Sequence, residues 1–256
     1  MAVFSSGIRR AVHERLVLAG CVAAGEETED LVVAAPDVET LMAWVARREQ
    51  GEPLAWITGT VDFLGRALHV HPGVFVPRAQ SAGLALRAAE LLPANGRAAD
   101  LCTGSGAVAA YLARVRPRAE VVGTDLDPDA AACARRNGVS VTVSDLDRGL
   151  CSRAFDVVSA VAPYVPTGAM HLLPSDVTRF EPRAALHGGH DGLDSVRRLV
   201  PGAARLLRRG GWLLAEIGGE QDALVQPILA AAGFGEPTFW RDSEGDLRGV
   251  AAQLVC

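Results

Sequence analysis

The first fifty residues alternate apolar and charged positions with a helical period. Apolar side chains return every three or four positions, as Ile8, Val12 and Leu16 do, and again at Leu41 and Val45. This spacing gives each helix one apolar stripe that packs against another element. Residues 1–50 are therefore expected to form a small helical domain, in which the Pro-Asp pair at 36–37 opens the later helix.

From residue 97 onward the pattern changes to short apolar runs separated by segments of helical period. The strand-like runs lie at residues 97–102, 121–125, 141–144, 155–160, 212–217, 237–241 and 249–255. The helical segments lie at residues 105–115, 194–209 and 221–232. Alternation of strands and helices is typical of an α/β fold. We expect residues 51–72 to form a connecting hairpin and residues 73–256 to form the larger domain.

Charge and composition narrow the classes of partner. The chain has 256 residues, a formal net charge of −5 and a pI near 5.7. Nucleic-acid-binding domains usually present a basic patch, and this charge balance offers none. All 25 basic residues are arginine, so no lysine is available for Schiff-base chemistry. We expect neither nucleic acid nor a membrane as a partner.

The five cysteines show no pairing pattern. Their number is odd and none has C-x-x-C spacing, so neither a disulfide framework nor a zinc site is indicated. The apolar run before the first cysteine begins only at Leu16, which is too short for a signal peptide. We expect reduced thiols, no metal and a cytoplasmic location. The cysteines are Cys21, Cys102, Cys133, Cys151 and Cys256.

A glycine-rich turn follows the first strand of the larger domain. Gly104 and Gly106 lie where this strand leads into a helix, and the missing side chains let a ligand approach the backbone. The free N–H groups of the helix start also face such a ligand. The segment 104–109 fits the G-x-G-x-x-A dinucleotide fingerprint, so an NAD-dependent oxidoreductase and an ordinary strand-to-helix turn are both alternatives.

Three features favour S-adenosylmethionine over NAD: Asp100 at the end of the first strand, a second acid near the expected adenine, and the Pro-Tyr loop at residues 163–164. Asp100 suits the ammonium group of S-adenosylmethionine and would repel a pyrophosphate. Asp125 suits two ribose hydroxyls, and Asp145 with Leu146 is expected to bracket the adenine. The predicted cofactor-binding residues are Asp100, Cys102, Thr103, Gly104, Ser105, Gly106, Asp125, Leu126, Asp145 and Leu146.

From about residue 51 the chain resembles the HemK/PrmC family of protein-(glutamine-N5) methyltransferases. The matching segments are 51–59, a V-x-V-P-R strand at 74–78, an E-P-R-A-A-L-H-G-G-H-D-G-L-D run at 181–194 and a G-G-W-L-L-A-E-I-G run at 210–218. The resemblance implies a seven-stranded Rossmann-like class I methyltransferase sheet with a small N-terminal helical domain that helps to recognise the protein substrate. It also implies S-adenosylmethionine as cofactor and S-adenosylhomocysteine as product.

The chain departs from this family at three places. Cys102 replaces a glycine of the cofactor loop, which should persist if this residue keeps an ordinary backbone conformation. Residues 79–81 read Ala-Gln-Ser and have lost the acid of the family segment. The family's N-P-P-Y is V-A-P-Y, so the asparagine that holds the acceptor amide is a valine. The candidate catalytic residues are Val161, Ala162, Pro163 and Tyr164.

Because of this valine, the sequence does not determine which acceptor is methylated. Valine offers no hydrogen bond, although the Ala162 carbonyl remains, and Tyr164 is expected beside the acceptor. No histidine among His71, His187 and His190 occupies a catalytic position of the family. The chain is therefore either a methyltransferase for a protein glutamine or a secondary-metabolite tailoring enzyme for a less polar small molecule. The latter would act by methylation or by a substitution or cyclisation that releases S-adenosylhomocysteine. A cofactor-binding protein without turnover is the third alternative.

Overall fold

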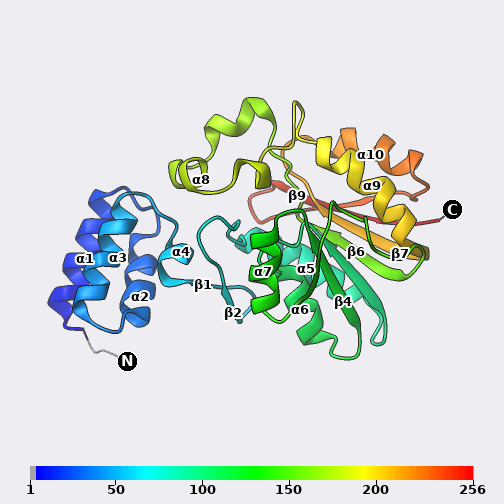
Figure 1. The fold of residues 1–256 in the computed structure, drawn as a ribbon. Helices are drawn as coiled ribbons and strands as arrows, with labels where there is room; N and C mark the ends of the chain where they lie inside the picture. The colour runs from blue at the N-terminus through cyan, green and yellow to red at the C-terminus, as the bar shows by residue number, and fades with distance from the viewer. Residues whose placement is uncertain (1–3, 256) are drawn as a thin grey trace.

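The computed structural model describes residues 4–255, which form a bundle of N-terminal helices beside a larger body built on a β-sheet (Figure 1). The bundle contains α1 (Ser6–Leu18), α2 (Ala24–Ala34) and α3 (Val38–Glu49). Among the described residues, no helix is both long enough and apolar enough to cross a bilayer.

The N-terminal helices enclose their own hydrophobic cluster. Val12 and Leu16 of α1 are fully buried against Leu31 of α2 and Leu41 of α3. The carboxylate of Asp37 accepts a hydrogen bond from the backbone N–H of Thr40 at 2.7 Å, which caps α3 as the Pro-Asp pair predicted. The apolar stripe of each helix therefore faces inward, as its period indicated.

The segment between the bundle and the sheet contains more structure than the expected hairpin. A short helix α4 (Leu54–Thr58) precedes the antiparallel pair β1 (Thr60–Asp62) and β2 (Ala67–His69). The strand expected at 74–78 is wrong, because these residues pair with no other strand. Their backbone is held by single contacts instead: the Trp56 indole donates to the Val74 carbonyl at 3.0 Å, and the Val76 N–H donates to the Glu181 carboxylate at 3.3 Å.

The sheet of the larger body has seven strands in the order β5-β4-β3-β6-β7-β9-β8. The first five in this order are parallel, and β9 runs antiparallel to both of its neighbours. This arrangement confirms the predicted α/β sheet. The strands are β3 (Arg97–Leu101), β4 (Glu120–Asp125), β5 (Ser140–Val143), β6 (Phe155–Ala160), β7 (Leu207–Glu216), β8 (Thr238–Arg241) and β9 (Leu247–Gln253).

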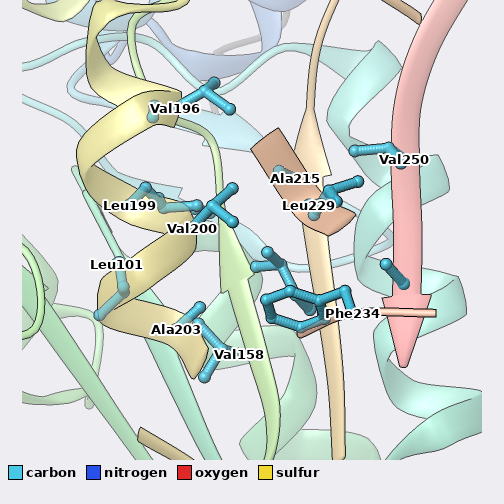
Figure 2. Close-up of a cluster of buried hydrophobic side chains, with 14 of the residues drawn as sticks. Leu101, Val158, Val196, Leu199, Val200, Ala203, Ala215, Leu229, Phe234 and Val250 are labelled. Carbon is cyan, nitrogen blue, oxygen red and sulfur yellow. The ribbon is translucent and has the colours of Figure 1, made fainter. Parts of the chain in front are cut away.

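Helices cover both faces of the sheet, and alternation along the strands decides which face each side chain meets. Ala98 and Val157 belong to the cluster formed with α5 (Ala82–Leu91) and α6 (Ala107–Val115). Leu101 and Val158 belong to the opposite cluster, formed with α9 (Asp194–Leu206) and α10 (Asp222–Ala231); Figure 2 shows α9 packing on this face. The two-residue period of the strands thus distributes the core between the two faces. A further helix, α7 (Pro128–Arg136), contacts β4 and β5.

The connection from β6 to α9 is longer and more structured than the sequence suggested. It contains two short 3-10 helices and α8 (Ser175–Phe180), which lies above the gap between the helical bundle and the sheet in Figure 1. Another 3-10 helix, η1 (Ala79–Ser81), precedes α5. None of these short helices has enough residues to show a periodic pattern. The helix expected from residue 105 starts two residues later, at Ala107.

Truncation of the core face of α9 should destabilise the protein. Leu199 is fully buried on this face, so we expect Leu199→Ala to lower the free energy of unfolding by about 2–5 kcal/mol through lost burial and the cavity left behind. Leu224→Ala on α10, whose side chain is 47% exposed, should change it by less than about 0.5 kcal/mol. Urea denaturation of both variants checks this, and equal effects would contradict the assignment of the core.

Candidate active site

The carboxyl ends of β3, β4 and β6 meet at one edge of the sheet, where a buried carboxylate connects β3 to β6 and to the glycine-rich loop. Asp100 near the end of β3 is only 2% exposed. One oxygen accepts a hydrogen bond from the Ser159 hydroxyl of β6 and the other from the Thr103 hydroxyl of the glycine-rich loop, both at 2.7 Å. Burial nevertheless raises the pKa of Asp100 to about 6, because it penalises the charged form more than these bonds favour it.

The glycine-rich loop bends through three left-handed residues, and Cys102 is one of them. Its φ is 54°, against 56° for Gly104 and 83° for Gly106. The condition stated for Cys102, an ordinary backbone conformation, is not met: the position keeps the backbone of a glycine although the side chain has changed. A left-handed residue with a Cβ costs roughly 1–2 kcal/mol. Burial and nearby carboxylates raise the pKa of the Cys102 thiol to about 12, so it stays protonated.

Asp125 at the end of β4 is hydrogen-bonded to the same loop. One carboxylate oxygen accepts from the Gly104 N–H at 2.8 Å and the other from the Asp127 N–H at 3.0 Å. Each oxygen keeps a second lone pair, so the carboxylate can also accept from ribose hydroxyls. Burial raises the pKa of Asp125. The residue therefore shapes the loop as well as the adjoining cavity.

A cavity of about 330 Å³ lies between these strand ends and α9. Asp145 lines it and forms an ion pair with Arg198 of α9 at 2.6 Å, a contact that the sequence did not reveal. Leu146 is buried, and its carbonyl accepts from the Thr124 hydroxyl at 2.8 Å. The predicted cofactor residues that line this cavity are Cys102, Gly104, Asp125, Leu126, Asp145 and Leu146. Asp100, Thr103 and Ser105 line a smaller cavity on the other side of the loop.

A larger cleft of about 900 Å³ separates the helical bundle from the sheet body. Val161, which follows β6, lines this cleft and both smaller cavities. Ala162 and Tyr164 also line the cleft, whereas Pro163 faces the 330 Å³ cavity. Val161 therefore stands where the predicted cofactor site and the open cleft meet.

Tyr164 belongs to a polar network that the sequence did not predict. Its hydroxyl donates to Glu216 at the end of β7 at 2.8 Å and accepts from the Gln80 side chain at 3.0 Å. The Ser81 hydroxyl donates to the second oxygen of Glu216 at 2.6 Å. Burial and the adjacent Glu216 raise the pKa of Tyr164, so the phenol stays neutral. Gln80 and Ser81 are two of the three residues that depart from the family segment. Their contacts with Glu216 join segments that are distant in sequence.

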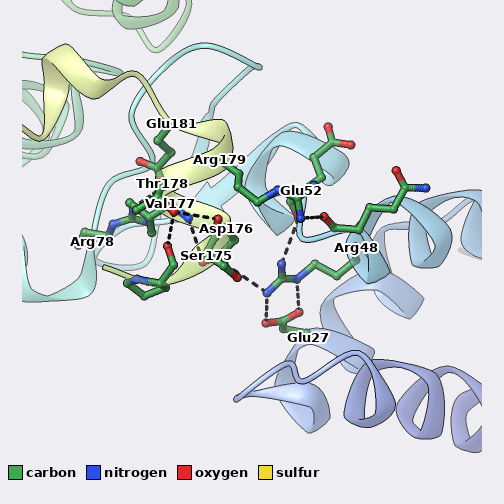
Figure 3. Close-up of polar contacts among 12 residues, drawn as sticks. Glu27, Arg48, Glu52, Arg78, Ser175, Asp176, Val177, Thr178, Arg179 and Glu181 are labelled. Atoms are coloured by element: carbon green, nitrogen blue, oxygen red, sulfur yellow. Dashed lines mark hydrogen bonds and ion pairs between the residues drawn. The ribbon is translucent and has the colours of Figure 1, made fainter. Parts of the chain in front are cut away.

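Ion pairs hold the walls of the cleft together (Figure 3). Arg48 of α3 pairs with Glu27 of α2 at 2.6 Å and reaches Asp176 of α8 at 3.6 Å. Arg78 pairs with the buried Glu181, which follows α8. The helical bundle, the segment before η1 and α8 are thus connected by side chains that no local pattern identifies.

No histidine lines any of the three cavities described above, and the His187 ring forms a hydrogen bond with the Thr167 hydroxyl at 2.9 Å. In residues 4–255, no group of three or more His, Cys, Asp and Glu side chains is placed to hold a metal ion. Cys21, Cys102, Cys133 and Cys151 are free thiols, and Cys256 lies outside the described residues.

The donors at the strand ends fit S-adenosylmethionine better than a dinucleotide. Asp100, Asp125 and Asp145 place three carboxyl groups around the glycine-rich loop. Carboxylates attract the positive charges of S-adenosylmethionine and repel a pyrophosphate. The buried Leu146 offers an apolar wall for an adenine. These residues support the predicted cofactor and not the NAD alternative.

Solved structures and family comparisons define the class of protein. Residues 65–165 match the methyltransferase small domain family. The 16S rRNA N2 G1207 methyltransferase of Thermus thermophilus, solved with AdoMet and guanosine, aligns with a TM-score of 0.52 at 19% identity over 77% of this chain and 44% of that chain. The ribosomal protein L11 methylase of Lactobacillus delbrueckii aligns with a TM-score of 0.52 at 17% identity over 73% of this chain and 84% of that chain. The larger body therefore has the fold of the class I methyltransferases.

Sequence relatives identify the family. The release factor glutamine methyltransferase of Geobacter sulfurreducens is 38% identical over 216 residues, which cover 82% of this chain and 76% of the relative. The release factor glutamine methyltransferase of Neisseria gonorrhoeae is 40% identical over 196 residues, which cover 73% of this chain and 71% of the relative. The chain belongs to the family of release factor glutamine methyltransferases, as its motifs predicted.

Loss of the Asp125 carboxylate should weaken cofactor binding. Asp125→Ala removes both the predicted ribose contact and the bond that shapes the loop, so we expect the Kd for S-adenosylhomocysteine to rise at least about tenfold. Asp129→Ala on α7, whose carboxylate has no role in the cavity, is the control and should leave the Kd within about twofold. Calorimetry measures both, and an unchanged Kd for Asp125→Ala would place the residue outside the pocket.

Cofactor affinity should also depend on pH through Asp100. With a pKa of about 6, the Asp100 carboxylate that is predicted to attract the cofactor's ammonium group is charged above that pH and neutral below it. We expect the affinity for S-adenosylmethionine to fall about tenfold between pH 7 and pH 5. The Asp100→Asn variant should bind S-adenosylmethionine weakly at both pH 7 and pH 5. Any pH dependence of its affinity that remains should come from Asp125. A wild-type affinity that is constant over this range would contradict the role.

In the absence of cofactor, the effect of Asp100 on the free energy of unfolding should have the opposite pH dependence to its effect on cofactor affinity. The folded pKa of about 6 exceeds the ordinary value of 3.8, so the folded state takes up a proton that the unfolded chain does not. The contribution of this carboxyl group to stability therefore increases as the pH falls from about 6 toward 4.

Proposed function

We propose that this protein transfers a methyl group from S-adenosylmethionine to the side-chain amide nitrogen of a glutamine in a release factor. The relatives that carry this name cover most of the chain. The observation that carries the proposal is the 900 Å³ cleft, which opens between the helical bundle and the sheet and meets the cofactor cavity at Val161. A glutamine on an exposed loop of another protein can enter such a cleft from solvent.

The chain contributes mainly by positioning. S-adenosylmethionine supplies an already activated methyl group, so the protein has to hold the amide nitrogen in line with it. Holding two reactants in this way can account for roughly 7–11 kcal/mol of a barrier. In the proposal, the Ala162 carbonyl accepts one amide hydrogen, Pro163 fixes the turn and Tyr164 packs beside the acceptor. The nitrogen loses its proton to solvent as the N–C bond forms and the C–S bond breaks.

Val161 is the residue that argues for a different acceptor. It presents methyl groups where the family has an amide, and an unpaired buried amide N–H costs roughly 1–3 kcal/mol. A small, less polar acceptor would avoid that cost. The breadth of the match to glutamine methyltransferases outweighs this single position, because the motifs from residue 181 to 218 are retained as well.

We assign residues 1–50 to substrate recognition, residues 51–72 to a connecting segment and residues 73–256 to cofactor binding and catalysis. The separate hydrophobic cluster of the helical bundle and its place along the cleft support this division. The expected partners remain a protein acceptor without nucleic acid or membrane, and the free thiols agree with a reaction in the cytoplasm.

Incubation with a purified bacterial release factor and S-adenosylmethionine tests the function. We expect the wild-type protein to add a single methyl group, located on a glutamine side chain by mass spectrometry of the digested release factor. Val161→Asn should raise kcat/KM by about two- to tenfold, since it adds one hydrogen bond to the amide.

The matched control is Val143→Asn on β5, an exposed valine outside the cavities, which should leave kcat/KM unchanged. If the wild-type protein binds the cofactor but leaves the release factor unmodified, glutamine methylation is excluded, and the small-molecule alternative replaces it.

A further inference from the structure

Gln80 is placed at the acceptor cleft, although its position in the sequence gives no sign of this. It lies in η1, is exposed, and lines the 900 Å³ cleft together with Val161, Ala162 and Tyr164. It lines neither of the two smaller cavities, so its side chain faces the acceptor side of the site and not the predicted cofactor side.

The contacts of its amide nitrogen fix the orientation of the Gln80 side chain. Nε2 donates to the Tyr164 hydroxyl at 3.0 Å and to Oε1 of Glu216 at 3.3 Å. The Tyr164 hydroxyl gives its own hydrogen to Glu216, so towards Gln80 its oxygen can only accept. A reversed amide would place the Gln80 oxygen against the carboxylate of Glu216, which is 3% exposed and a pure acceptor when ionised.

This orientation leaves the amide oxygen of Gln80 available. Within residues 4–255, no group donates a hydrogen bond to its Oε1 atom, while both hydrogens of Nε2 are used. The oxygen is therefore an acceptor whose position is fixed by the hydrogen bonds of Gln80 with Tyr164, which follows β6, and with Glu216, at the end of β7. Ser81, which donates to the other oxygen of Glu216 at 2.6 Å, secures that network from the neighbouring position.

We propose that the Gln80 side-chain oxygen accepts a hydrogen bond from the acceptor amide and supplies the contact that Val161 cannot make. This inference rests on the proposed glutamine acceptor, whose NH₂ group has two hydrogens to place. The Ala162 carbonyl takes one of them and Gln80 the other. Gln80 is thus a substrate-binding residue, and the substitutions at residues 80 and 161 compensate for each other.

The test compares kcat/KM for the release factor among variants at this position. Gln80→Ala removes the oxygen, and Gln80→Met removes it while keeping the length of the side chain. Both should lower kcat/KM by about ten- to hundredfold, because one amide hydrogen loses its partner. Gln226→Ala on the exposed surface of α10 is the control for loss of a glutamine and should have no effect.

Two further measurements separate a direct contact from a structural one. The Kd for S-adenosylhomocysteine should stay within about twofold in both Gln80 variants, since Gln80 is absent from the cofactor cavities. Val161→Asn should rescue Gln80→Ala by a larger factor than it improves the wild type, because the two side chains would satisfy the same amide hydrogen.

The outcomes distinguish this role from the function on which it rests. If the wild type methylates the release factor and the Gln80 variants do so equally well, the role of Gln80 is overturned and the proposed function stands. Equal gains from Val161→Asn with and without Gln80 also overturn the role. If the wild type leaves the release factor unmodified, the proposed function falls and the role falls with it.

Discussion

The buried carboxylate of Asp100 is the constraint on which the active site depends. A carboxylate excluded from water needs hydrogen-bond partners, and Asp100 has one on each side, in Thr103 of the glycine-rich loop and in Ser159 of β6. These bonds connect β3, the cofactor loop and the strand that ends just before Val161. The same burial raises the pKa of Asp100 to about 6, close to neutral pH.

The cleft depends on a second set of contacts between segments that are distant in sequence. Arg48 connects the helical bundle to α8, and Arg78 connects the segment before η1 to Glu181. A partly buried ion pair adds little stability on balance, but loss of one partner leaves an uncompensated charge. Such pairs therefore fix the relative positions of the walls more than they strengthen the fold.

The departures from the family motifs can be understood together once the structure is known. Cys102 keeps the left-handed backbone of the glycine it replaces, so the loop geometry is preserved at a modest conformational cost. Val161 offers no polar side-chain atom to the cleft, while Gln80 places one in the same cleft. The fold tolerates these exchanges because each leaves the strand ends and the buried carboxylates in place.

The sequence by itself determined the strands of the main sheet, several of the helices and the positions of the acids at the strand ends. Short apolar runs indicated the seven strands of the main sheet, and a period near 3.6 residues indicated the N-terminal helices, α6, α9 and α10 but neither α5 nor α7. Asp100, Asp125 and Asp145 could be placed together because parallel strands end at one edge. Only the tertiary structure decided the backbone of Cys102, the pairing of Asp145 with Arg198 and the contact of Gln80 with Glu216, which are 136 positions apart. Those features depend on how connections pack over the sheet, and a local pattern carries no information about contacts between distant segments.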